Sequence, residues 1–527
     1  MRRSFLIVTI ILFGFFLYLK IPVKAASCTM YVANNGSDTI GNGTSTSPYA
    51  TINQAQSKTK AGDTVCVRAG TYLASKINIS SVGTAALPII FMKDPGTTGA
   101  VILDGTGSGL GSGQAVVLIA KAQYVTFDGF EVTNSPADGI DVDNSSNIVV
   151  SNNKIHNTQG SASSMDGSNI TFTKNEVYNA SLKNLNDAYG SGGWPGVVLT
   201  WTKPDGSPST NIMFTNNFIH DSWGEGIIAL YLDGALIKGN IIKDCFGVLI
   251  YSDRAKNVTI DSNYVAMTTD AHNKNGYRPD GILTAVEMSS HNNSTTPGSE
   301  NVTISNNLVL GTNYGIGYWH DTQNKAQTNT YTGLHIYYNT VKDTKTFPLW
   351  LDTVTSSYPL PTQNEVKNNI FYQGSDGNKG LIGNVSGTAF SNNDWVNGIP
   401  TFDSTANGSF SSDPMFISPS SIYQPTPDGY KISNNSPVVG KGTQVAVTND
   451  YYGNGRPVSN TDIGFYQSSS SVKIGDGNGD GKIDNVDYTI WLNHFGQTLS
   501  GVINGDFNNN GKVDGIDYIL WVINFGK

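Results

Sequence analysis

The chain has 527 residues with a formal net charge of −9, and only 14% of its residues are charged. This acidity argues against nucleic acid as a partner, because nucleic-acid-binding surfaces are basic. The 58 Gly residues, together with the regular recurrence of Val and Ile, indicate a turn-rich, extracellular all-β protein rather than a disordered chain. The length allows one large core and additional small modules.

Residues 1–26 have the pattern of an export signal. Arg2 and Arg3 precede an apolar run from Phe5 to Leu19, and small residues lead up to Ala25. The apolar run is short for a membrane-spanning helix, so we expect cleavage after Ala25 and a secreted protein. An uncleaved membrane anchor that keeps the protein at the cell surface is the alternative.

Residues 27–105 are predicted to cap one end of the repeats that follow, since the open end of a solenoid exposes its core. A short helix is expected within residues 47–55. Cys28 and Cys66 lie in two strand-like runs, and a disulfide between them is possible only if these strands are neighbours. Cys245 is expected to be a buried small residue.

Residues 106–400 contain a repeat in which an Asn or Gly is followed six positions later by an Asn and then by x-Val or x-Ile. The spacing is 22 or 23 residues, or about twice that, and the apolar residues alternate as in strands. This pattern predicts a right-handed parallel β-helix in which the second Asn of each unit stacks on its counterpart one coil away. We assign these Asn residues an architectural role only. They are Asn153, Asn175, Asn217, Asn240, Asn263, Asn307, Asn339 and Asn369.

A second strand of each unit begins with Gly, followed by Ile or Val. Because side chains alternate along a strand, we expect the first residue after Gly to point inward and the next to point outward. Applied to Gly196, this rule places Val198 and Thr200 on the outer face. Residues 401–467 are predicted to close the domain, and residues 468–473 have the composition of a linker.

Residues 474–527 form a separate module with an internal duplication at a spacing of 30 residues. Each half carries oxygen-bearing side chains at loop positions 1, 3, 5 and 12 with Gly at position 6, which is the pattern of a Ca²⁺-binding loop followed by a helix. The two predicted Ca²⁺ sites use Asp476, Asn478, Asp480, Lys482 (through its carbonyl) and Asp487, and Asp506, Asn508, Asn510, Lys512 (through its carbonyl) and Asp517.

This duplicated loop-and-helix module resembles the type I dockerin, which implies a cohesin-like scaffold protein as a partner. Loop positions 10 and 11 are Asn485 and Val486, and Gly515 and Ile516, in place of the Ser-Thr type residues that dockerins often use for partner recognition. The segments at 31–38, 47–51 and 62–72 resemble the opening of secreted β-helix polysaccharide lyases and glycosidases. These resemblances imply a secreted, carbohydrate-active enzyme.

Asp138, Asp141 and Asp143 follow one another within six residues. They resemble the motif that supplies one catalytic Asp in polygalacturonases, but the other motifs of that family are missing. Alternatively, they hold a third Ca²⁺, as in pectate lyases, where a Lys or Arg removes the α-proton of a uronate. Arg254 and Arg278 are candidates for that base or for a substrate clamp. Turn residues without a catalytic role are the third possibility.

Further candidates for hydrolysis are carboxylates that could form an acid–base pair. They are Asp253, Asp280, Glu287, Asp321 and Asp352. His320 and Asp321 form a possible proton-transfer pair, and Tyr251, Trp319 and Trp350 are expected on the outer face, where aromatic rings can stack on sugars. The irregular inserts 180–210 and 266–300 are predicted to wall a groove, and 266–300, with the highest density of polar residues, is the first place to expect the site.

We therefore expect a polysaccharide-degrading hydrolase or lyase on a β-helix, tethered through its calcium-binding tail. A non-catalytic glycan-binding or cell-surface scaffold is the alternative.

Overall fold

The computed structural model describes residues 27–73, 76–189, 195–273, 278–287, 298–320, 330–354, 359–419, 426–433, 435–468, 473–478, 482–499, 501–508 and 510–526. The predicted export signal and the side chains of Asp321 and Asp480 lie outside these residues. Among the described helices, none is long and apolar enough to cross a membrane.

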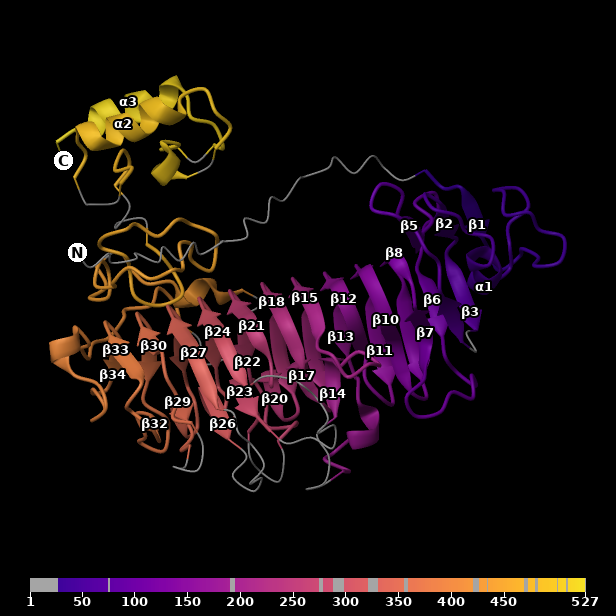
Figure 1. Cartoon of the computed structure of the whole chain (residues 1–527), viewed down its shortest axis with the longest axis horizontal. Coiled ribbons are helices and arrows are strands. Elements are labelled where there is room, and N and C mark those ends of the chain that lie inside the picture. Colours follow the sequence, from indigo (N-terminus) through magenta and orange to yellow (C-terminus); the bar gives the residue numbers. More distant parts are fainter. Residues whose placement is uncertain are drawn as a thin grey trace, which may run out of the picture.

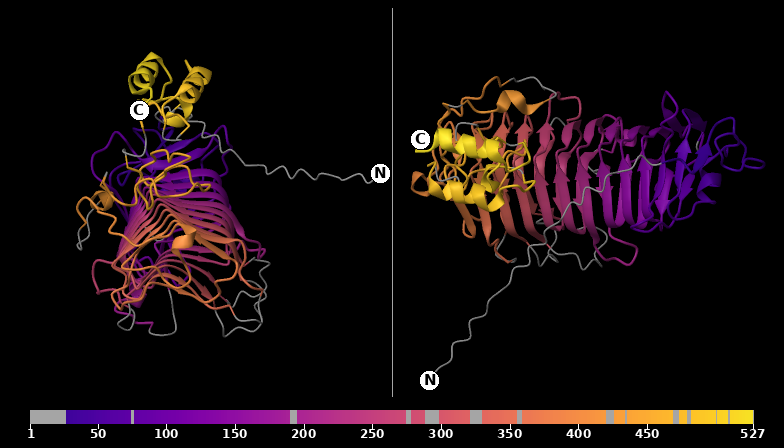
Figure 2. Two further views of the ribbon diagram at one scale, coloured as in Figure 1. Left: turned by 90° about the vertical axis from the view of Figure 1, so that its left-hand side faces the viewer. Right: turned by 90° about the horizontal axis from the view of Figure 1, so that it is seen from above.

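The repeats form a parallel β-helix with three rows of strands (Figure 1). Seen along the long axis, the coils lie one behind another, so that each row continues through the whole solenoid (Figure 2). The first and second rows are joined into one sheet because the long strands β10 (Asp138–Ser151) and β12 (Ser163–Thr173) pass from one row into the other. Strands in each row pair in parallel with the next coil.

The first row comprises β4 (Ile77–Ile79), β7 (Ala115–Ala120), the first halves of β10 and β12, β14 (Gly196–Thr200), β17 (Glu225–Leu230), β20 (Val248–Asp253), β23 (Asp280–Val286), β26 (Tyr314–His320), β29 (Phe347–Leu351) and β32 (Leu381–Ile382). The second row comprises β1 (Met30–Val32), β2 (Thr64–Val67), β5 (Ile89–Lys93), β8 (Gln123–Asp128), the second halves of β10 and β12, β15 (Ser209–Thr215), β18 (Leu232–Lys238), β21 (Lys256–Asp261), β24 (Ser299–Ser305), β27 (Tyr331–Tyr337), β30 (Asn364–Lys367) and β33 (Thr388–Ser391).

The third row is a separate sheet. It comprises β3 (Gly70–Leu73), β6 (Val101–Asp104), β9 (Glu131–Ser135), β11 (Lys154–Thr158), β13 (Glu176–Tyr178), β16 (Phe218–Ser222), β19 (Ile241–Cys245), β22 (Tyr264–Ala266), β25 (Leu308–Leu310), β28 (Thr340–Lys342), β31 (Ile370–Tyr372) and β34 (Asp394–Val396). Short 3₁₀ turns occupy Leu182–Asn184, Thr405–Asn407, Pro427–Tyr430 and Val502–Asn504.

The predicted Asn stack is present and buried. Each Asn Oδ1 accepts hydrogen bonds from the backbone N–H and the Nδ2 of its counterpart in the preceding coil, as Asn263 does from Asn240 at 3.0 and 2.9 Å. Its own Nδ2 donates to the next Asn and to a backbone carbonyl, that of Ile237 in the case of Asn263. The stack includes one member that the repeat did not predict, Asn393, whose backbone N–H donates to Ser409 Oγ.

The first position of the repeat alternates between Asn and Gly for a different reason. The residues there have left-handed backbones with φ between 51° and 88°, a conformation that Asn and Gly adopt at least cost. They are Asn147, Asn169, Asn211, Gly234, Asn257, Asn301 and Gly333.

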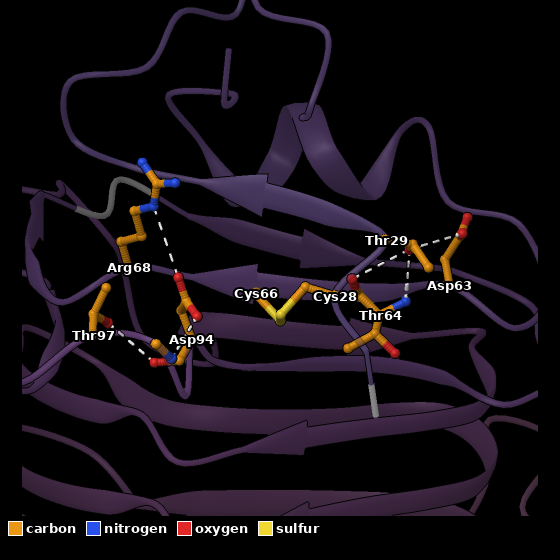
Figure 3. Close-up of a disulfide and its surroundings, with 9 residues drawn as sticks. Cys28, Thr29, Asp63, Thr64, Cys66, Arg68, Asp94 and Thr97 are labelled. Atoms are coloured by element: carbon orange, nitrogen blue, oxygen red, sulfur yellow. Dashed lines mark hydrogen bonds and ion pairs between the residues drawn. A yellow bond between two sulfur atoms is a disulfide. The ribbon is translucent and has the colours of Figure 1, made fainter. Parts of the chain in front are cut away.

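Residues 27–105 were predicted to be a cap, but their strands β1 to β6 already belong to the three rows of the solenoid. Cys28 and Cys66 form a disulfide, with their Cα atoms 5.6 Å apart, so the strands that carry them are indeed neighbours (Figure 3). The helix α1 (Ile52–Gln56) begins after Thr51, whose hydroxyl caps it, so the first part of the range predicted for this helix is not helical. Cys245 is buried, as predicted.

The closing segment folds back over the outer face of earlier coils. Its buried Arg456 donates through Nη2 to Asn306 Oδ1 and to the carbonyl of Gly464, both at 2.8 Å, and its guanidinium lies 3.8 Å from the centre of the Tyr338 ring. The backbone N–H of Ser468, the first residue of the predicted linker, donates to Asp462 at 2.6 Å, so contacts within this segment extend to that residue.

Replacing a central member of the Asn stack is expected to destabilise the β-helix strongly. In Asn263→Ala, the buried N–H and Nδ2 groups of Asn240 lose their acceptor, which costs roughly 3 kcal/mol of unfolding free energy. Asn301→Gly is the matched control, because Gly already occupies the equivalent left-handed position in two coils. Urea unfolding measures both, and equal midpoints for the two variants would contradict the assigned role of the stack.

Candidate functional site

A cleft of about 340 Å³ opens on the outer face of the first strand row. Its floor is formed by the start of β10, which contributes Asp138 and Asp141, and by the neighbouring coil, which contributes Ser161 and Ser164. The insert 180–210 forms its other wall, which confirms that this insert borders a groove. The side chains of that wall include Lys183, Tyr189, Leu199 and Trp201.

The two carboxylates are fixed by the backbone of the next coil. Ser161 N–H donates to Asp138 Oδ1 at 2.7 Å, and Ser164 N–H donates to Asp141 Oδ1 at 3.0 Å. A side chain at Gly160 would place its Cβ 2.0 Å from Asp138 Oδ1, so glycine is required there for the carboxylate to occupy its position. Parallel pairing of the coils thus holds both groups in the same cleft.

Burial and mutual repulsion raise the proton affinity of this pair. Burial raises the pKa of Asp138, although the Ser161 N–H and the charge of Lys183 act against it. The pKa of Asp141 lies well above its ordinary value because of burial and the neighbouring negative charge of Asp138. The pKa of Asp141 is therefore raised more strongly than that of Asp138.

A second carboxylate pair lies two residues further along the same strands. Burial, followed by the charge of Asp143, raises the pKa of Asp166 to about 7, against the hydrogen bond that Asn144 N–H donates at 2.9 Å. The sequence analysis included Asp143 but missed Asp166. Asp166 could have been found from the coil length, because it follows Asp143 by 23 residues. The structure agrees, since the preceding residues Val142 and Met165 are paired in adjacent coils.

The predicted orientation of the side chains at residues 198–201, on the aromatic wall of the cleft, was also wrong. The rule based on Gly196 placed Val198 and Thr200 outward, but both are buried in the interior, and Leu199 and Trp201 face the cleft instead. The reason is register: Gly196 pairs with Glu225, the residue before the Gly of the next unit, so the alternation is shifted by one. Trp201 is 37% exposed and Tyr189 is 46% exposed.

A separate group of predicted residues lies at Tyr251, on the same strand row. The Tyr251 hydroxyl donates to the Glu287 carboxylate, Glu287 N–H donates to Asp253 at 2.9 Å, and Arg254 Nε donates to the Glu287 carbonyl at 2.6 Å. Burial and the charge of Glu287 raise the pKa of Asp253 well above its ordinary value. Tyr251 is only 6% exposed, so it is not the open sugar-stacking surface that the sequence predicted.

The remaining predicted residues are dispersed. Asp280 accepts hydrogen bonds from Asn313 and from the Tyr314 N–H, and burial raises its pKa to about 7. Arg278 pairs with Asp270 at 2.7 Å and lines a different hollow of about 490 Å³. His320 is buried and its Nδ1 lies 2.9 Å from the Tyr318 hydroxyl.

Two further regions lie outside the Asp138 cleft. The insert 266–300 stays a predicted location of a site: its described residues Asp270 and Arg278 line the different hollow, and His272 is buried against Trp223. His156 in the third row is 8% exposed, with Nε2 3.0 Å from Glu131 and its ring stacked on Tyr178.

We tested whether the β-helix side chains fit a metal ion. Within the described ranges, no three His, Cys, Asp or Glu side chains are arranged to hold one. The alternative of a Ca²⁺ at Asp138, Asp141 and Asp143 therefore has no support from their positions, and we derive no chemistry from a metal there.

The C-terminal loops have the residue types that suit calcium, although in their described residues too no three His, Cys, Asp or Glu side chains are grouped around one position. Their carboxylates at positions 1 and 12 are buried: Asp476, Asp487, Asp506 and Asp517. Buried carboxylates are stable when they coordinate a cation, and the side-chain amides and carbonyls of the loops supply the further hard oxygen ligands that Ca²⁺ prefers.

Each loop is followed by a helix, as predicted: α2 (Asn485–His494) and α3 (Gly515–Asn524). The two halves interlock symmetrically, since Trp491 Nε1 donates to the carbonyl of Asp514 and Trp521 Nε1 donates to that of Asp484, both at 2.9 Å.

Comparison with known proteins agrees with both parts of the fold. Family models match three regions: a Pel9A-like, right-handed β-helix region (30–193), a right-handed β-helix region (205–331) and a dockerin type I domain (474–525). No curated protein sequence matches the chain.

Solved structures with a similar fold include XylC in complex with xylose, with a TM-score of 0.56 and 14% identity over 83% of this chain and 98% of that one. The pectate lyase Pel9A has a TM-score of 0.48 and 16% identity over 84% and 98%, and a rhamnogalacturonan lyase has 0.48 and 17% over 76% and 94%. The predicted right-handed parallel β-helix and the dockerin-like tail are confirmed.

The raised pKa of Asp166 predicts a specific pH dependence of stability. Because the folded state binds this proton more tightly than the unfolded chain, stability decreases as the pH rises from the ordinary Asp value of 3.8 to about 7. Asp166→Asn is expected to lose less stability than the wild type between pH 5 and pH 8 in urea unfolding. The exposed Asp205 serves as the control through Asp205→Asn, and parallel curves for all three proteins would contradict the assignment.

Calcium binding by the tail can be tested with two neighbouring substitutions. Asp517→Asn removes a buried ligand carboxylate, whereas Asp514→Asn changes only the helix N-cap, where Asn is an equally good cap. Calorimetry of the full chain is expected to show two bound Ca²⁺ for the wild type and Asp514→Asn, and one for Asp517→Asn. An unchanged stoichiometry in Asp517→Asn would exclude it as a ligand.

Proposed function

We propose that this chain, a right-handed parallel β-helix joined to a C-terminal dockerin type I domain, is a secreted polysaccharide-degrading enzyme that cleaves its substrate in the Asp138 cleft. The observation that carries the proposal is the pair Asp138 and Asp141. Both face one cleft, both have raised pKa values, and exposed aromatic rings lie on the opposite wall.

The chemistry that this pair supports is glycoside hydrolysis. Asp141, which holds the proton more tightly, acts as the general acid that protonates the glycosidic oxygen of the leaving group. Asp138, whose pKa burial raises less than that of Asp141 because the Ser161 N–H and the charge of Lys183 oppose the increase, acts as the carboxylate that activates water or attacks the sugar. The pair thus divides into acid and base through its surroundings rather than through its residue types.

Tyr189 and Trp201 are the proposed sugar-binding residues of the cleft. A pyranose ring presents apolar C–H faces, which stack on aromatic rings that are partly exposed to water. Tyr189 is held in place because its N–H donates to Asn184 Oδ1 at 3.0 Å, and the Asn184 amide donates to the carbonyl of Trp223 at 2.9 Å. The wall of the cleft is therefore anchored to the β-helix.

A polysaccharide lyase is the second candidate, and Lys183 is the residue that favours it. Its amine lines the same cleft as Asp138 and is a base of the type needed to remove the α-proton of a uronate. The family model that covers this region is named after Pel9A, a pectate lyase. The products distinguish the two reactions, because elimination leaves an unsaturated uronate and hydrolysis does not.

The tail is proposed to bind two Ca²⁺ and to attach the enzyme to a cohesin-like scaffold protein. The apolar residues Ile516, Ile519 and Ile523 on α3 are all more than half exposed and offer a surface for such a partner. The Cys28–Cys66 disulfide fits an oxidising, extracellular location.

The test is a panel of polysaccharides incubated with the wild type, Asp138→Asn and Asp141→Asn. Loss of a general acid or base reduces the rate by about 10²–10⁴-fold, so both variants are expected to be nearly inactive on the substrate that the wild type cleaves. New reducing ends without unsaturated product indicate hydrolysis. Unsaturated product, abolished in Lys183→Ala, indicates the lyase.

The matched control is Asp233→Asn, which removes a carboxylate from the second strand row, where Asp233 pairs with Lys256 at 3.2 Å. This variant is expected to retain wild-type activity. If the wild type binds polysaccharides but releases no product from any of them, the proposal is wrong and the non-catalytic glycan-binding alternative holds.

A further inference from the structure

An aromatic cluster lies on the outer face of the first strand row, near its C-terminal end. It consists of Tyr314 and Trp319 on β26, and Phe347 and Trp350 on β29, all partly exposed. We propose that this cluster is a second glycan-binding site, separate from the Asp138 cleft, that holds an uncharged stretch of a polysaccharide chain. The site does not depend on whether the cleft cleaves that chain.

The rings are held together across neighbouring coils. Tyr314 pairs with Phe347 in the sheet, and their ring centres are 5.8 Å apart with planes inclined by 23°. The Tyr314 ring is also 4.5 Å from the Trp350 ring, at 31°. The three rings therefore form one cluster rather than isolated surface residues.

Gly317 provides the space for the Trp350 indole. The two residues are paired in adjacent coils, and a Cβ added at Gly317 would lie 2.6 Å from the Trp350 carbonyl oxygen, 2.8 Å from Leu283 Cδ2 and 3.4 Å from Trp350 Cε3. Any other residue at this position would therefore collide with the backbone beneath the indole and with Leu283. The bare backbone lets the indole lie low against the sheet while part of it stays open to solvent.

The cluster is continuous with the cleft but distinct from it. Contacts between outward apolar residues lead from Leu199, in the cleft wall, to Trp350. The residues between them are buried, with exposures of 5% for Ile228, 6% for Tyr251 and 3% for Leu283. The cluster lies seven coils from Asp141, or about 34 Å at about 4.8 Å per coil, so it does not belong to the same pocket.

The residue types in and beside the cluster indicate which kind of ligand it binds. The interior of the coil does not require these rings, because they stand on the outer face. Partly exposed aromatic rings bind the C–H faces of sugars, whereas an anionic sugar needs a cation beside them. Asp352, two residues after Trp350, places a partly exposed carboxylate beside the cluster instead; it lies 3.4 Å from the His320 N–H and repels a uronate. An uncharged polysaccharide is therefore the fitting occupant.

The test is affinity electrophoresis of the full chain in the presence of Ca²⁺, with Asp138→Asn and Asp141→Asn introduced together to prevent cleavage. The gels contain xylan, xyloglucan, galactomannan, mixed-linkage β-glucan or polygalacturonate. We expect retardation by at least one uncharged polymer, about tenfold weaker in Trp350→Ala and largely restored in Trp350→Phe. Leu73→Ala, which removes an exposed apolar side chain from β3 in the third strand row, is the control and is expected to retain retardation by the polymer.

Leu381, which is 45% exposed and pairs with Trp350, provides a second variant that does not disturb folding. Leu381→Ala is expected to reduce retardation by a smaller factor at an unchanged melting temperature. Lack of retardation in every uncharged polymer overturns the proposal, as does equal retardation of the wild type and Trp350→Ala. A Trp350-dependent dimer without polysaccharide binding overturns it in favour of a contact between copies. Retardation without product release by the enzyme with an intact cleft leaves this site standing and refutes the proposed cleavage.

Discussion

The hydrogen bonds of the buried Asn stack are the constraint on which the rest of the structure depends. Each amide must be paired with the amides of two neighbouring coils, because an unpaired polar group in this interior costs far more than a single hydrogen bond contributes. Coils of 22 to 44 residues are thereby brought into one register, and the additional residues of the longer coils form loops outside the strands. The strands of the outer face have the same alignment, so Asp138 and Asp141 accept hydrogen bonds from the backbone of Ser161 and Ser164.

At the candidate site, the alignment of the coils brings acidic side chains close to one another. Stacked coils place side chains of neighbouring units about 4.8 Å apart. At this separation apolar side chains pack against one another, whereas side chains of like charge repel one another. Asp143 and Asp166 meet in this way, and Asp138 and Asp141 approach along one strand. Burial raises the pKa of Asp138, Asp141 and Asp166, and the charge of a neighbouring carboxylate raises it further for Asp141 and Asp166. The repeated stacking that forms the apolar interior therefore also produces carboxyl groups with raised pKa values at one place on the surface.

Much of the fold could be predicted because it depends on local, repeated chemistry. The Asn spacing, the alternation of apolar residues and the two calcium loops each require particular residue types at particular positions. The exposure of outward residues could not be predicted, since it depends on which insert covers them: Trp201 lies in an open cleft, whereas Tyr251, in the same strand row, is buried against Glu287. Val198 and Thr200 were misplaced because one Gly is offset by a single residue, and Asp166 was missed because its significance comes only from the coil beside it.

The contacts of Arg456 have a consequence for the order of folding. This residue reaches Asn306, which precedes it by 150 residues, and packs on the ring of Tyr338. Neither partner is in place until the coils that carry them have stacked, so the closing segment is the last part of the β-helix to assemble. A chain that is interrupted before residue 456 lacks Phe465, which in the complete protein packs with Tyr430 against Tyr264 and Leu308. The contacts of the Arg456 guanidinium with Asn306 and Tyr338 can therefore form only in a chain that contains the closing segment.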